Sequence, residues 1–368
     1  MSFLLGRVMQ KSKKGAVSIR YALIVILFLS FFIPSVLWAG QPTGPGVTVL
    51  IYHRFGEDRY PTTNVSAERF REQLAYLMMN NYQVISLSDL VSAIEHKTPL
   101  PDKAVVITID DGYRSFYDVG WPILRSFGYP FTVFLYVKGV DSGSQAYMTW
   151  DQVREVQQQG GDFQDHSYSH SRMADRPKGL DVIGYRAWIR DDLHKGAQIL
   201  EKNLGHKAQF LAIPYGEYNT IVQEEAGKLG YEAIMSQDPG SISLETDLNS
   251  IPREPILGNE WSTMKHFEEV LNRIDMPVTV MEPPPAPLKS AQVKRFGAFL
   301  LYPDRYEPNS LGIYVSGLGW HRASVDGDFM YIDNNQPLKR HVNRVTVSGK
   351  DRKSGRLAMR TWMIIRPD

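Results

Sequence analysis

Short strands and amphipathic helices are predicted to alternate between residues 47 and 235, and this alternation constrains the fold more than any other feature. Runs rich in β-branched and aromatic residues recur along this stretch, at 47–52, 104–109, 131–137, 162–165, 209–212 and 232–235. Helical patterns separate most of these runs, and three of them lie at 115–127, 149–159 and 187–204. The helix at 149–159 is predicted to begin with a Thr149/Gln152 capping box. A further helix is predicted to begin after Ser66, its cap, with one face formed by Phe70, Leu74, Leu77 and Met78. Repeated strand and helix units predict a parallel α/β domain.

Two adjacent aspartates, Asp110 and Asp111, follow one of the predicted strands. Side chains alternate along an extended chain, so one carboxylate can bind a cation while the other faces a substrate. On its own, an Asp-Asp-Gly sequence is more often an exposed turn. Downstream, however, His166 and His170 lie four residues apart, a spacing that lets both imidazoles reach one metal. Asp111, His166 and His170 therefore form a candidate ligand set, and two nitrogens with one oxygen suit Zn²⁺.

These residues belong to an ordered set of motifs that resembles the signature of the polysaccharide deacetylases, the NodB-homology group that forms carbohydrate esterase family 4. The sequence Thr108-Ile109-Asp110-Asp111 is similar to the family's Thr-Phe-Asp-Asp motif, with Ile in place of Phe. His166-Ser167-Tyr168-Ser169-His170 and Pro214-Tyr215-Gly216 resemble the second and third motifs, and 148–152 is also similar. The resemblance covers roughly residues 47 to 256.

The resemblance implies a distorted, incomplete (β/α) barrel, whose active site gathers where strands end. It implies that Asp111, His166 and His170 hold a divalent metal, most simply Zn²⁺ with Co²⁺ or Ni²⁺ as alternatives, and that Asp110 is the base acting on metal-activated water. Tyr215 would supply an oxyanion contact through its backbone N–H.

The general acid is less obvious, because the family's late Leu-x-His motif is not evident. His266 lies in an amphipathic segment where a solvated surface role is the simpler reading. Tyr52-His53 follows the first predicted strand, as in the circularly permuted poly-N-acetylglucosamine deacetylases that this chain resembles in motif layout. We therefore expect His53 to be the general acid, although a strand-end histidine capped by backbone is the plainer alternative.

Two departures from the family pattern concern the surroundings of these residues. Ala212 stands where many members have an arginine that orients the catalytic aspartate, and Arg253 is the natural substitute. An ordinary ion pair between Arg253 and Glu254, or another surface pair, is the alternative. Asp165, beside His166, is either an acceptor for a ligand imidazole or an exposed charge at a strand end. The remaining histidines are expected at the surface: His96, His194, His206, His321 and His341.

The amino end has five basic residues before an apolar run from Tyr21 to Trp38. This run is typical of a signal peptide cleaved after Ala39, or of an uncleaved anchor, and Leu37 favours the anchor because cleavage sites prefer small residues there. We therefore expect a membrane-anchored protein facing the periplasm or cell exterior, or a secreted one. The chain has no cysteine and a net charge of +1, and no basic stripe indicates nucleic-acid binding.

Four segments are expected along the chain. Residues 1–44 form the basic tail, anchor and linker, 45–275 the deacetylase-like domain, 276–290 a proline-rich spacer, and 291–368 a small β-sandwich-like domain. Aromatic residues of the last segment are more simply buried core than a sugar-stacking surface: Tyr314, Trp320, Tyr331 and Trp362.

The function implied by the resemblance is metal-dependent removal of N-acetyl groups from an envelope or exported polysaccharide, most plausibly an N-acetylglucosamine polymer. Two alternatives stay open. One keeps the chemistry but changes the substrate, as in an O-acetyl esterase or another non-peptide amide hydrolase. The other is a non-catalytic polysaccharide-binding module that has lost turnover through Ala212, against which the retained base, ligand set and oxyanion motif argue.

Overall fold

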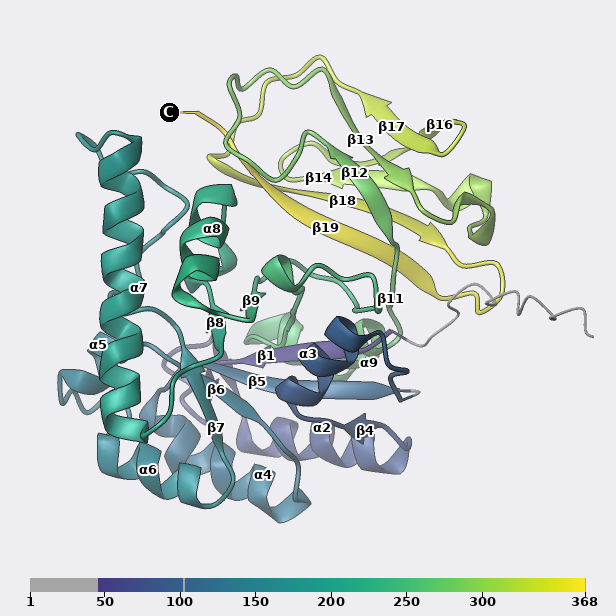
Figure 1. The fold of residues 1–368 in the computed structure, drawn as a ribbon. Helices are drawn as coiled ribbons and strands as arrows, with labels where there is room; N and C mark the ends of the chain where they lie inside the picture. Colours follow the sequence, from purple (N-terminus) through teal and green to yellow (C-terminus); the bar gives the residue numbers. More distant parts are fainter. Residues whose placement is uncertain (1–45, 102, 368) are drawn as a thin grey trace, which may run out of the picture. The chain divides into compact units, whose positions relative to one another are not determined.

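A computed structural model describes residues 46–101 and 103–367 of the chain (Figure 1). The basic tail, the apolar run at 21–38 and the linker that follows it up to residue 45 lie outside the described residues, so the signal or anchor prediction does too. Among the described helices, none combines the length and apolarity that a membrane crossing requires.

An eight-stranded sheet organises the first part of the described chain, and all of its strand pairs are parallel. Its order is β10-β1-β5-β6-β7-β8-β9, with β4 also beside β5. A parallel bridge from Met235 at the end of β9 to Ile251, just before β10, brings the two ends of this order together. The sheet is therefore the predicted incomplete barrel, which these pairings and similar solved structures confirm. Its strands are β1 (Thr48–Tyr52), β4 (Gln83–Val84), β5 (Ala104–Asp111), β6 (Thr132–Leu135), β7 (Asp162–Asp165), β8 (Phe210–Ala212), β9 (Ala233–Met235) and β10 (Glu254–Pro255).

Capped helices connect these strands. Ser66, Ser86, Thr149, Asp181, Asn219 and Thr263 each accept a backbone N–H at a helix start, and the Thr149/Gln152 capping box is present as predicted. The helices are α2 (Ala67–Met79), α3 (Leu87–His96), α4 (Trp121–Phe127), α5 (Val137–Asp141), α6 (Trp150–Gln158), α7 (Val182–Leu204), α8 (Thr220–Leu229) and α9 (Met264–Leu271). Shorter elements are β2 (Arg54–Phe55), β3 (Asn64–Val65), η1 (Phe116–Gly120), η2 (Pro214–Gly216), η3 (Leu248–Ser250), η4 (Asn259–Ser262), η5 (Pro303–Arg305) and η6 (Pro308–Ser310).

Two local predictions in this region were wrong. Met78 was placed on the buried face of its helix with Leu74, but its side chain is 59% exposed because it lies at the edge of the apolar stripe. Val137 was placed in a strand, but it begins α5, because the chain turns directly after β6.

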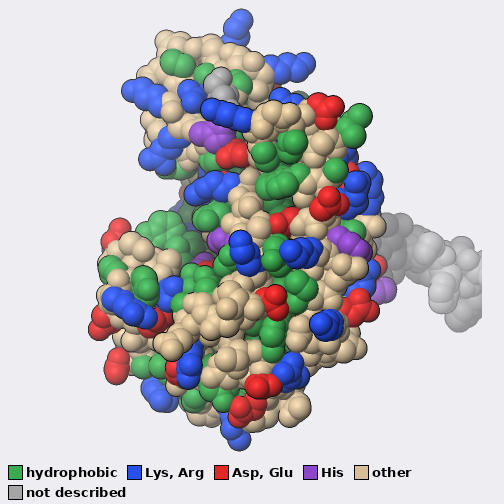
Figure 2. All heavy atoms as spheres, turned by 90° about the vertical axis from the view of Figure 1, so that its left-hand side faces the viewer, with side chains coloured by type: hydrophobic (Ala, Val, Ile, Leu, Met, Phe, Trp, Pro, Cys, Tyr) green, Lys and Arg blue, Asp and Glu red, His purple; other side chains and the backbone are tan. Residues whose placement is uncertain are grey.

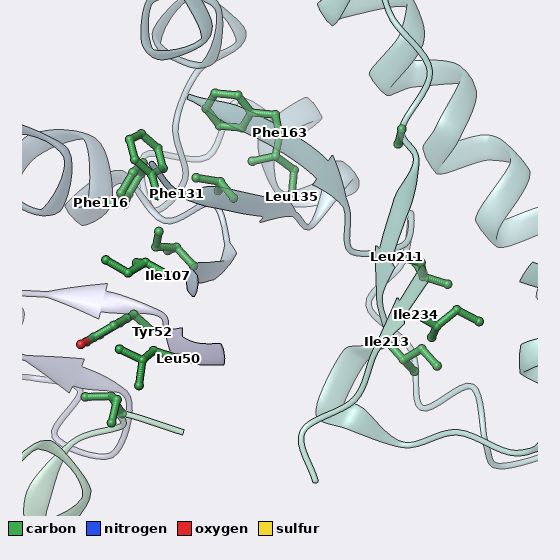
Figure 3. Close-up of a cluster of buried hydrophobic side chains, with 14 of the residues drawn as sticks. Leu50, Tyr52, Ile107, Phe116, Phe131, Leu135, Phe163, Leu211, Ile213 and Ile234 are labelled. Carbon is green, nitrogen blue, oxygen red and sulfur yellow. The ribbon is translucent and has the colours of Figure 1, made fainter. Parts of the chain in front are cut away.

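The sheet is buried on both faces, as expected for parallel strands. In β5, Val105, Ile107 and Ile109 join the core that the sheet shares with the surrounding helices, whereas Val106 joins a second cluster with α3. Figure 3 shows part of the first cluster, in which Ile107 lies among side chains of neighbouring strands such as Leu50 and Leu135. Because side chains alternate, Asp110 shares the face of Val106, and this strand carries it into the barrel interior.

The last part of the chain is all-β, as predicted, and consists of two antiparallel-rich sheets. The first has the order β11-β19-β18-β14-β15 and the second β12-β13-β17-β16. A separate apolar cluster, which includes the fully buried Trp362 and Phe296, fills this region. Its strands are β11 (Ile274–Asp275), β12 (Val278–Glu282), β13 (Arg295–Leu300), β14 (Gly312–Val315), β15 (Gly319–Arg322), β16 (Ser324–Asp326), β17 (Phe329–Asp333), β18 (Val342–Lys350) and β19 (Leu357–Ile365).

The boundaries of this region differ from those expected. Strand β12 lies inside the 276–290 segment that was predicted to be a spacer, since its β-forming residues precede the first proline of the run at Pro283. Strand β11, from the segment assigned to the deacetylase-like domain, pairs with β19. The all-β region therefore begins before Pro277.

The aromatic residues of this region divide between core and surface. Trp362 is buried, as expected, but Trp320 is 56% exposed and Tyr314 is 41% exposed. These two residues are a cross-strand pair on β14 and β15, where β15 is the edge strand of its sheet. Expecting them in the core was therefore wrong, because position at a sheet edge is not visible in local sequence.

The all-β region also shares the core of the barrel. Met363 and Ile365 of β19 belong to the same buried cluster as the barrel residues Leu211 and Ile213.

Over most of the face drawn in Figure 2, Lys and Arg side chains are interspersed with Asp and Glu side chains.

Candidate active site

Asp111, His166 and His170 come together at the carboxyl ends of two strands. Asp111 ends β5, His166 directly follows β7, and His170 lies in the loop beyond it. The Oδ1 atom of Asp111 lies 3.2 Å from Nε2 of His170 and 3.5 Å from Nε2 of His166. One ligand atom from each residue falls within 4.8 Å of the others, which fits a single cation.

The orientation of His166 supports this reading. Its Nδ1 lies 2.7 Å from the carbonyl oxygen of Ala212, which can only accept, so Nδ1 carries the proton and Nε2 keeps its lone pair. Both Nε2 of His166 and Oδ1 of Asp111 are buried without a hydrogen-bond partner among the described residues. Buried polar atoms are rarely left unpaired, so the residues fit a metal ligand set.

Electrostatics keep the cluster in its ligand form. Burial lowers the pKa of His166 to about 4, against the opposing charge of Asp110, so its imidazole is neutral near pH 7. Burial alone would raise the pKa of Asp111, but the neighbouring histidines, His170 first among them, hold that pKa well below its ordinary value. A neutral imidazole and an ionised carboxylate are the forms that bind cations.

Several residues of the site adopt left-handed backbone conformations. The φ angles are 71° at Asp111, 64° at Ser167, 54° at His170 and 61° at Tyr215. Residues other than glycine rarely adopt such values, and they persist where neighbours enforce them. Here the Ser167 hydroxyl accepts the backbone N–H of His170 at 3.0 Å, which helps to fix the loop between the two histidines.

Asp110 is held by Arg253, and both side chains are fully buried. Two parallel bonds join them, from Nη1 to Oδ1 at 2.7 Å and from Nη2 to Oδ2 at 2.8 Å. Arg253 also donates to the Thr108 hydroxyl at 3.2 Å and to the Ser236 carbonyl at 2.8 Å. Burial alone would raise the pKa of Asp110, but the charge of Arg253 lowers it below its ordinary value, so the carboxylate stays ionised.

The structure therefore brings Arg253 to the place expected of the family's orienting arginine. The alternative pair with Glu254 is wrong, because the Glu254 carboxylate bonds to Arg273 at 2.6 Å. Ala212, which stands where that arginine is usual, contributes its carbonyl to His166 instead. Although position 212 is alanine, Asp110 therefore still has an arginine partner, which is Arg253.

His53 lies at the end of β1 beside the aspartate pair. In the register of β1 with β5, Tyr52 lies opposite Ile109, so His53 follows at the level of Asp110. Its Nδ1 is buried and has no hydrogen-bond partner among the described residues, so the expected backbone cap is not present at that atom. His266 is half-buried, not solvated as expected, and its Nε2 lies 3.2 Å from the Pro255 carbonyl, with its ring near Trp261.

Tyr215 occupies the tight turn η2 at the rim of the site. Its ring is 39% exposed and packs edge-on against His170, with 4.7 Å between ring centroids. The ring centroids of Tyr136 and His170 lie 5.3 Å apart, and the Arg172 guanidinium lies 4.0 Å from the centre of the Tyr215 ring. Sequence reasoning missed Tyr136 and Arg172, because neither belongs to a motif and only the fold brings them to the metal ligands.

Asp165 has neither of the roles expected for it. It is fully buried, so it is no exposed charge, and His166 uses the Ala212 carbonyl as its acceptor. Its Oδ2 instead accepts the Tyr231 hydroxyl at 2.5 Å. Burial raises the pKa of Asp165 to about 7. The other histidines are exposed as expected except His341, which is half-buried and contacts Asp175 at 2.6 Å.

Comparison with known proteins gives a family match for the middle of this chain. Residues 97–234 match the family model described as polysaccharide deacetylase. A poly-beta-1,6-N-acetyl-D-glucosamine N-deacetylase of Escherichia coli (strain K12) is 30% identical over 262 residues, covering 62% of this chain and 37% of the relative. A protein of the same name from Staphylococcus epidermidis is 22% identical, covering 57% of this chain and 73% of the relative. The chain thus spans little more than a third of the Escherichia coli protein.

Two solved structures resemble this chain in fold. The Streptococcus pyogenes deacetylase PplD in complex with acetate is 25% identical with a TM-score of 0.53, covering 59% of this chain and 95% of that one. IcaB from Ammonifex degensii has a TM-score of 0.51 at 24% identity, covering 61% of this chain and 97% of that one, and supports the fold alone.

Proposed function

The chain contains a polysaccharide deacetylase domain, and from this premise we propose that the protein is a metal-dependent hydrolase that removes N-acetyl groups from an N-acetylglucosamine polymer. The observation that carries the proposal is the juxtaposition of two units. One is the Asp111, His166 and His170 cluster with its unpaired ligand atoms, and the other is Asp110 in its bidentate bond to Arg253. Relatives whose names specify poly-beta-1,6-N-acetyl-D-glucosamine support the choice of polymer.

Asp111, His166 and His170 would hold the cation, for which we propose Zn²⁺ because the donors are two nitrogens and one oxygen. When bound, a divalent cation supplies Lewis acidity, which lowers the pKa of water and polarises a carbonyl group. The site would thereby activate water at neutral pH.

The protein's own side chains would carry the protons. Asp110 stays ionised beside Arg253 and is the general base that removes a proton from the attacking water. Arg253 positions that carboxylate through two parallel bonds, which favour one orientation of the carboxylate. The backbone N–H of Tyr215 is proposed as an oxyanion contact, as the family resemblance implies.

His53 is proposed as the general acid for the leaving amine. An amine expelled from a tetrahedral intermediate must be protonated, so a histidine beside the aspartate pair suits an amide substrate. Its place beside Asp110 in the strand register supports this role, whereas the described contacts of His266 lie with Pro255 and Trp261.

We also propose that the protein acts outside the cytoplasm, anchored through residues 21–38 or released after cleavage near Ala39. The basis is the basic and apolar sequence of that segment together with an exported polymer as substrate.

Acetate release from poly-N-acetylglucosamine, with and without chelator, tests the proposed function. We expect release that stops on chelation and returns with Zn²⁺, Co²⁺ or Ni²⁺, and a metal content that falls in His166→Ala/His170→Ala. Acetate from O-acetylated glycans alone would indicate an esterase, and binding of polymer without any acetate release would indicate a non-catalytic module. Equal metal content in the wild type and the double variant would refute the ligand assignment.

A further inference from the structure

The loop that follows β9 is anchored by a residue of the all-β region. Asp238 in this loop is almost completely buried. Its Oδ1 accepts a bond from Nε of Arg344 on β18 at 2.9 Å, and its Oδ2 accepts the Tyr218 hydroxyl at 2.9 Å. Asp238 therefore joins the all-β region to the barrel.

The same loop holds the arginine that orients Asp110. The carbonyl of Asp238 accepts the backbone N–H of Arg253 at 3.1 Å. The carbonyl of Ser236 accepts Nε of Arg253 at 2.8 Å, while the Ser236 hydroxyl accepts the N–H of Asp238 at 3.2 Å. A continuous chain of bonds thus runs from Arg344 through Asp238 and Arg253 to Asp110.

A second branch of this network reaches the turn at the rim of the site. Tyr218 is buried and lies two residues after η2, the turn that contains Tyr215. Its bond to Asp238 ties the end of this turn to the loop that carries Ser236. Asp238 is therefore linked both to the residue that orients the base and to the turn that we propose contacts the oxyanion.

Arg344 supplies the positive charge that this buried carboxylate needs. Among the described residues, Arg344 is the ion-pair partner of Asp238. Burial raises the pKa of Asp238, and the charge of Arg344 opposes that rise. Without Arg344 the carboxylate would lose that compensation, which favours a shift of the loop towards water.

We propose that Arg344 is a positioning residue through which the all-β region completes the active site. It fixes Asp238, and through Asp238 the side chain of Arg253 and the turn that contains Tyr215. The role in turnover rests on the proposed function, whereas the mechanical link between Arg344 and Arg253 does not. The all-β region is therefore part of the catalytic unit and not an independent appendage.

The test compares Arg344→Met with Arg360→Met in the full-length protein. Arg360 on β19 also donates to a buried aspartate, Asp275, at 2.7 Å, and Asp275 accepts the Ser243 hydroxyl. This pair therefore contacts the same loop, but at a point that does not bond to Arg253. Displacing catalytic groups by about 1 Å can cost about a hundredfold in rate, so kcat should fall between about tenfold and a hundredfold in Arg344→Met. Metal content and KM should stay near wild type, and Arg360→Met should keep its kcat despite a comparable loss of thermal stability.

Charge removal provides a rescue that a general folding defect would not show. Asp238→Asn in the Arg344→Met background removes the uncompensated carboxylate, so it should recover part of kcat, and Arg344→Lys should lose less than Arg344→Met. If Arg344→Met does not fold, the lysine and double variants decide the question. Wild-type kcat in Arg344→Met, an equal loss in Arg360→Met, or a double variant no better than the single one would each overturn the proposal.

Hydrogen exchange separates this proposal from the proposed function. The Arg253 amide, which bonds to Asp238, should exchange faster in Arg344→Met than in the wild type or Arg360→Met. If the wild type releases no acetate but this exchange changes, the proposed function fails while the link stands. Unchanged exchange would overturn the link whatever the activity.

Discussion

Replacing Arg253 with methionine should lower stability and turnover by amounts that can be measured separately. Arg253 makes four side-chain bonds in full burial, two to Asp110 and one each to Thr108 and Ser236. Removing one partner of a buried ion pair costs about 3–5 kcal/mol, because the other charge is left unpaired. We expect the free energy of unfolding to fall by about that amount in Arg253→Met.

Turnover should fall further than stability alone would explain. Asp110 loses both its fixed orientation and the charge that keeps it ionised, so kcat should drop by about 10²- to 10⁴-fold, the usual contribution of a general base. Arg253→Lys should be intermediate, since a single ammonium cannot form the bidentate pair. Both variants should retain metal, because Arg253 does not contact the ligand set through its described bonds.

The double variant Asp110→Asn/Arg253→Met is the control for stability. It removes the unpaired carboxylate, so it should unfold at a higher denaturant concentration than Arg253→Met while remaining inactive. Chemical denaturation, metal analysis and acetate release measure the three quantities. A fully active and stable Arg253→Met, or a double variant as unstable as the single one, would refute the reasoning.

Three further predictions concern roles and pH dependence. Asp110→Asn should keep its metal yet lose turnover by orders of magnitude, whereas Asp111→Asn should weaken metal binding itself. Metal analysis and acetate release measure the two effects, and if the two variants showed each other's result, the roles of Asp110 and Asp111 would have to be exchanged. His53→Ala should slow hydrolysis of an N-acetylglucosamine oligomer by about 10²- to 10⁴-fold but spare an aryl acetate, whose phenolate leaves without protonation, and a silent His53→Ala beside an inactive, folded His266→Ala would contradict this. Burial raises the pKa of Asp275 above its ordinary 3.8, so the folded state binds this proton more readily than the unfolded chain does. The wild type should therefore lose stability relative to Asp275→Asn as pH rises above about 4, and thermal midpoints that differ by a constant amount up to about pH 8 would count against it.

The sequence predicted best the features that depend on short stretches of chain. The strand at Asp162–Asp165 and the Thr149 capping box follow from local pattern, and both are present. The ligand set could be assembled because two of its members lie four residues apart and all three follow predicted strands. Parallel strands gather their carboxyl ends at one edge, so the topology did the rest.

Features that depend on contacts between distant segments were less accessible. Arg253 could be named as a substitute partner for Asp110, but the choice against Glu254 required the position of Arg273. The burial of Asp165 depends on Tyr231, 66 residues away along the chain. Strand β12 was not predicted, because the prolines that directly follow it led to the whole segment being assigned as a spacer.

The left-handed residues of the site also bear on how this protein can evolve. Each such conformation costs a residue other than glycine on the order of 1–3 kcal/mol, so glycine at Ser167 would make the backbone more favourable without removing a metal ligand. It would also remove the hydroxyl that accepts the His170 N–H and would give the loop more freedom in the unfolded chain. Backbone strain therefore favours glycine at this position, whereas the hydrogen bond within the loop and the smaller freedom of the unfolded chain favour serine. With serine at position 167, the chain keeps the bond that holds the loop between the two histidines and retains the backbone strain.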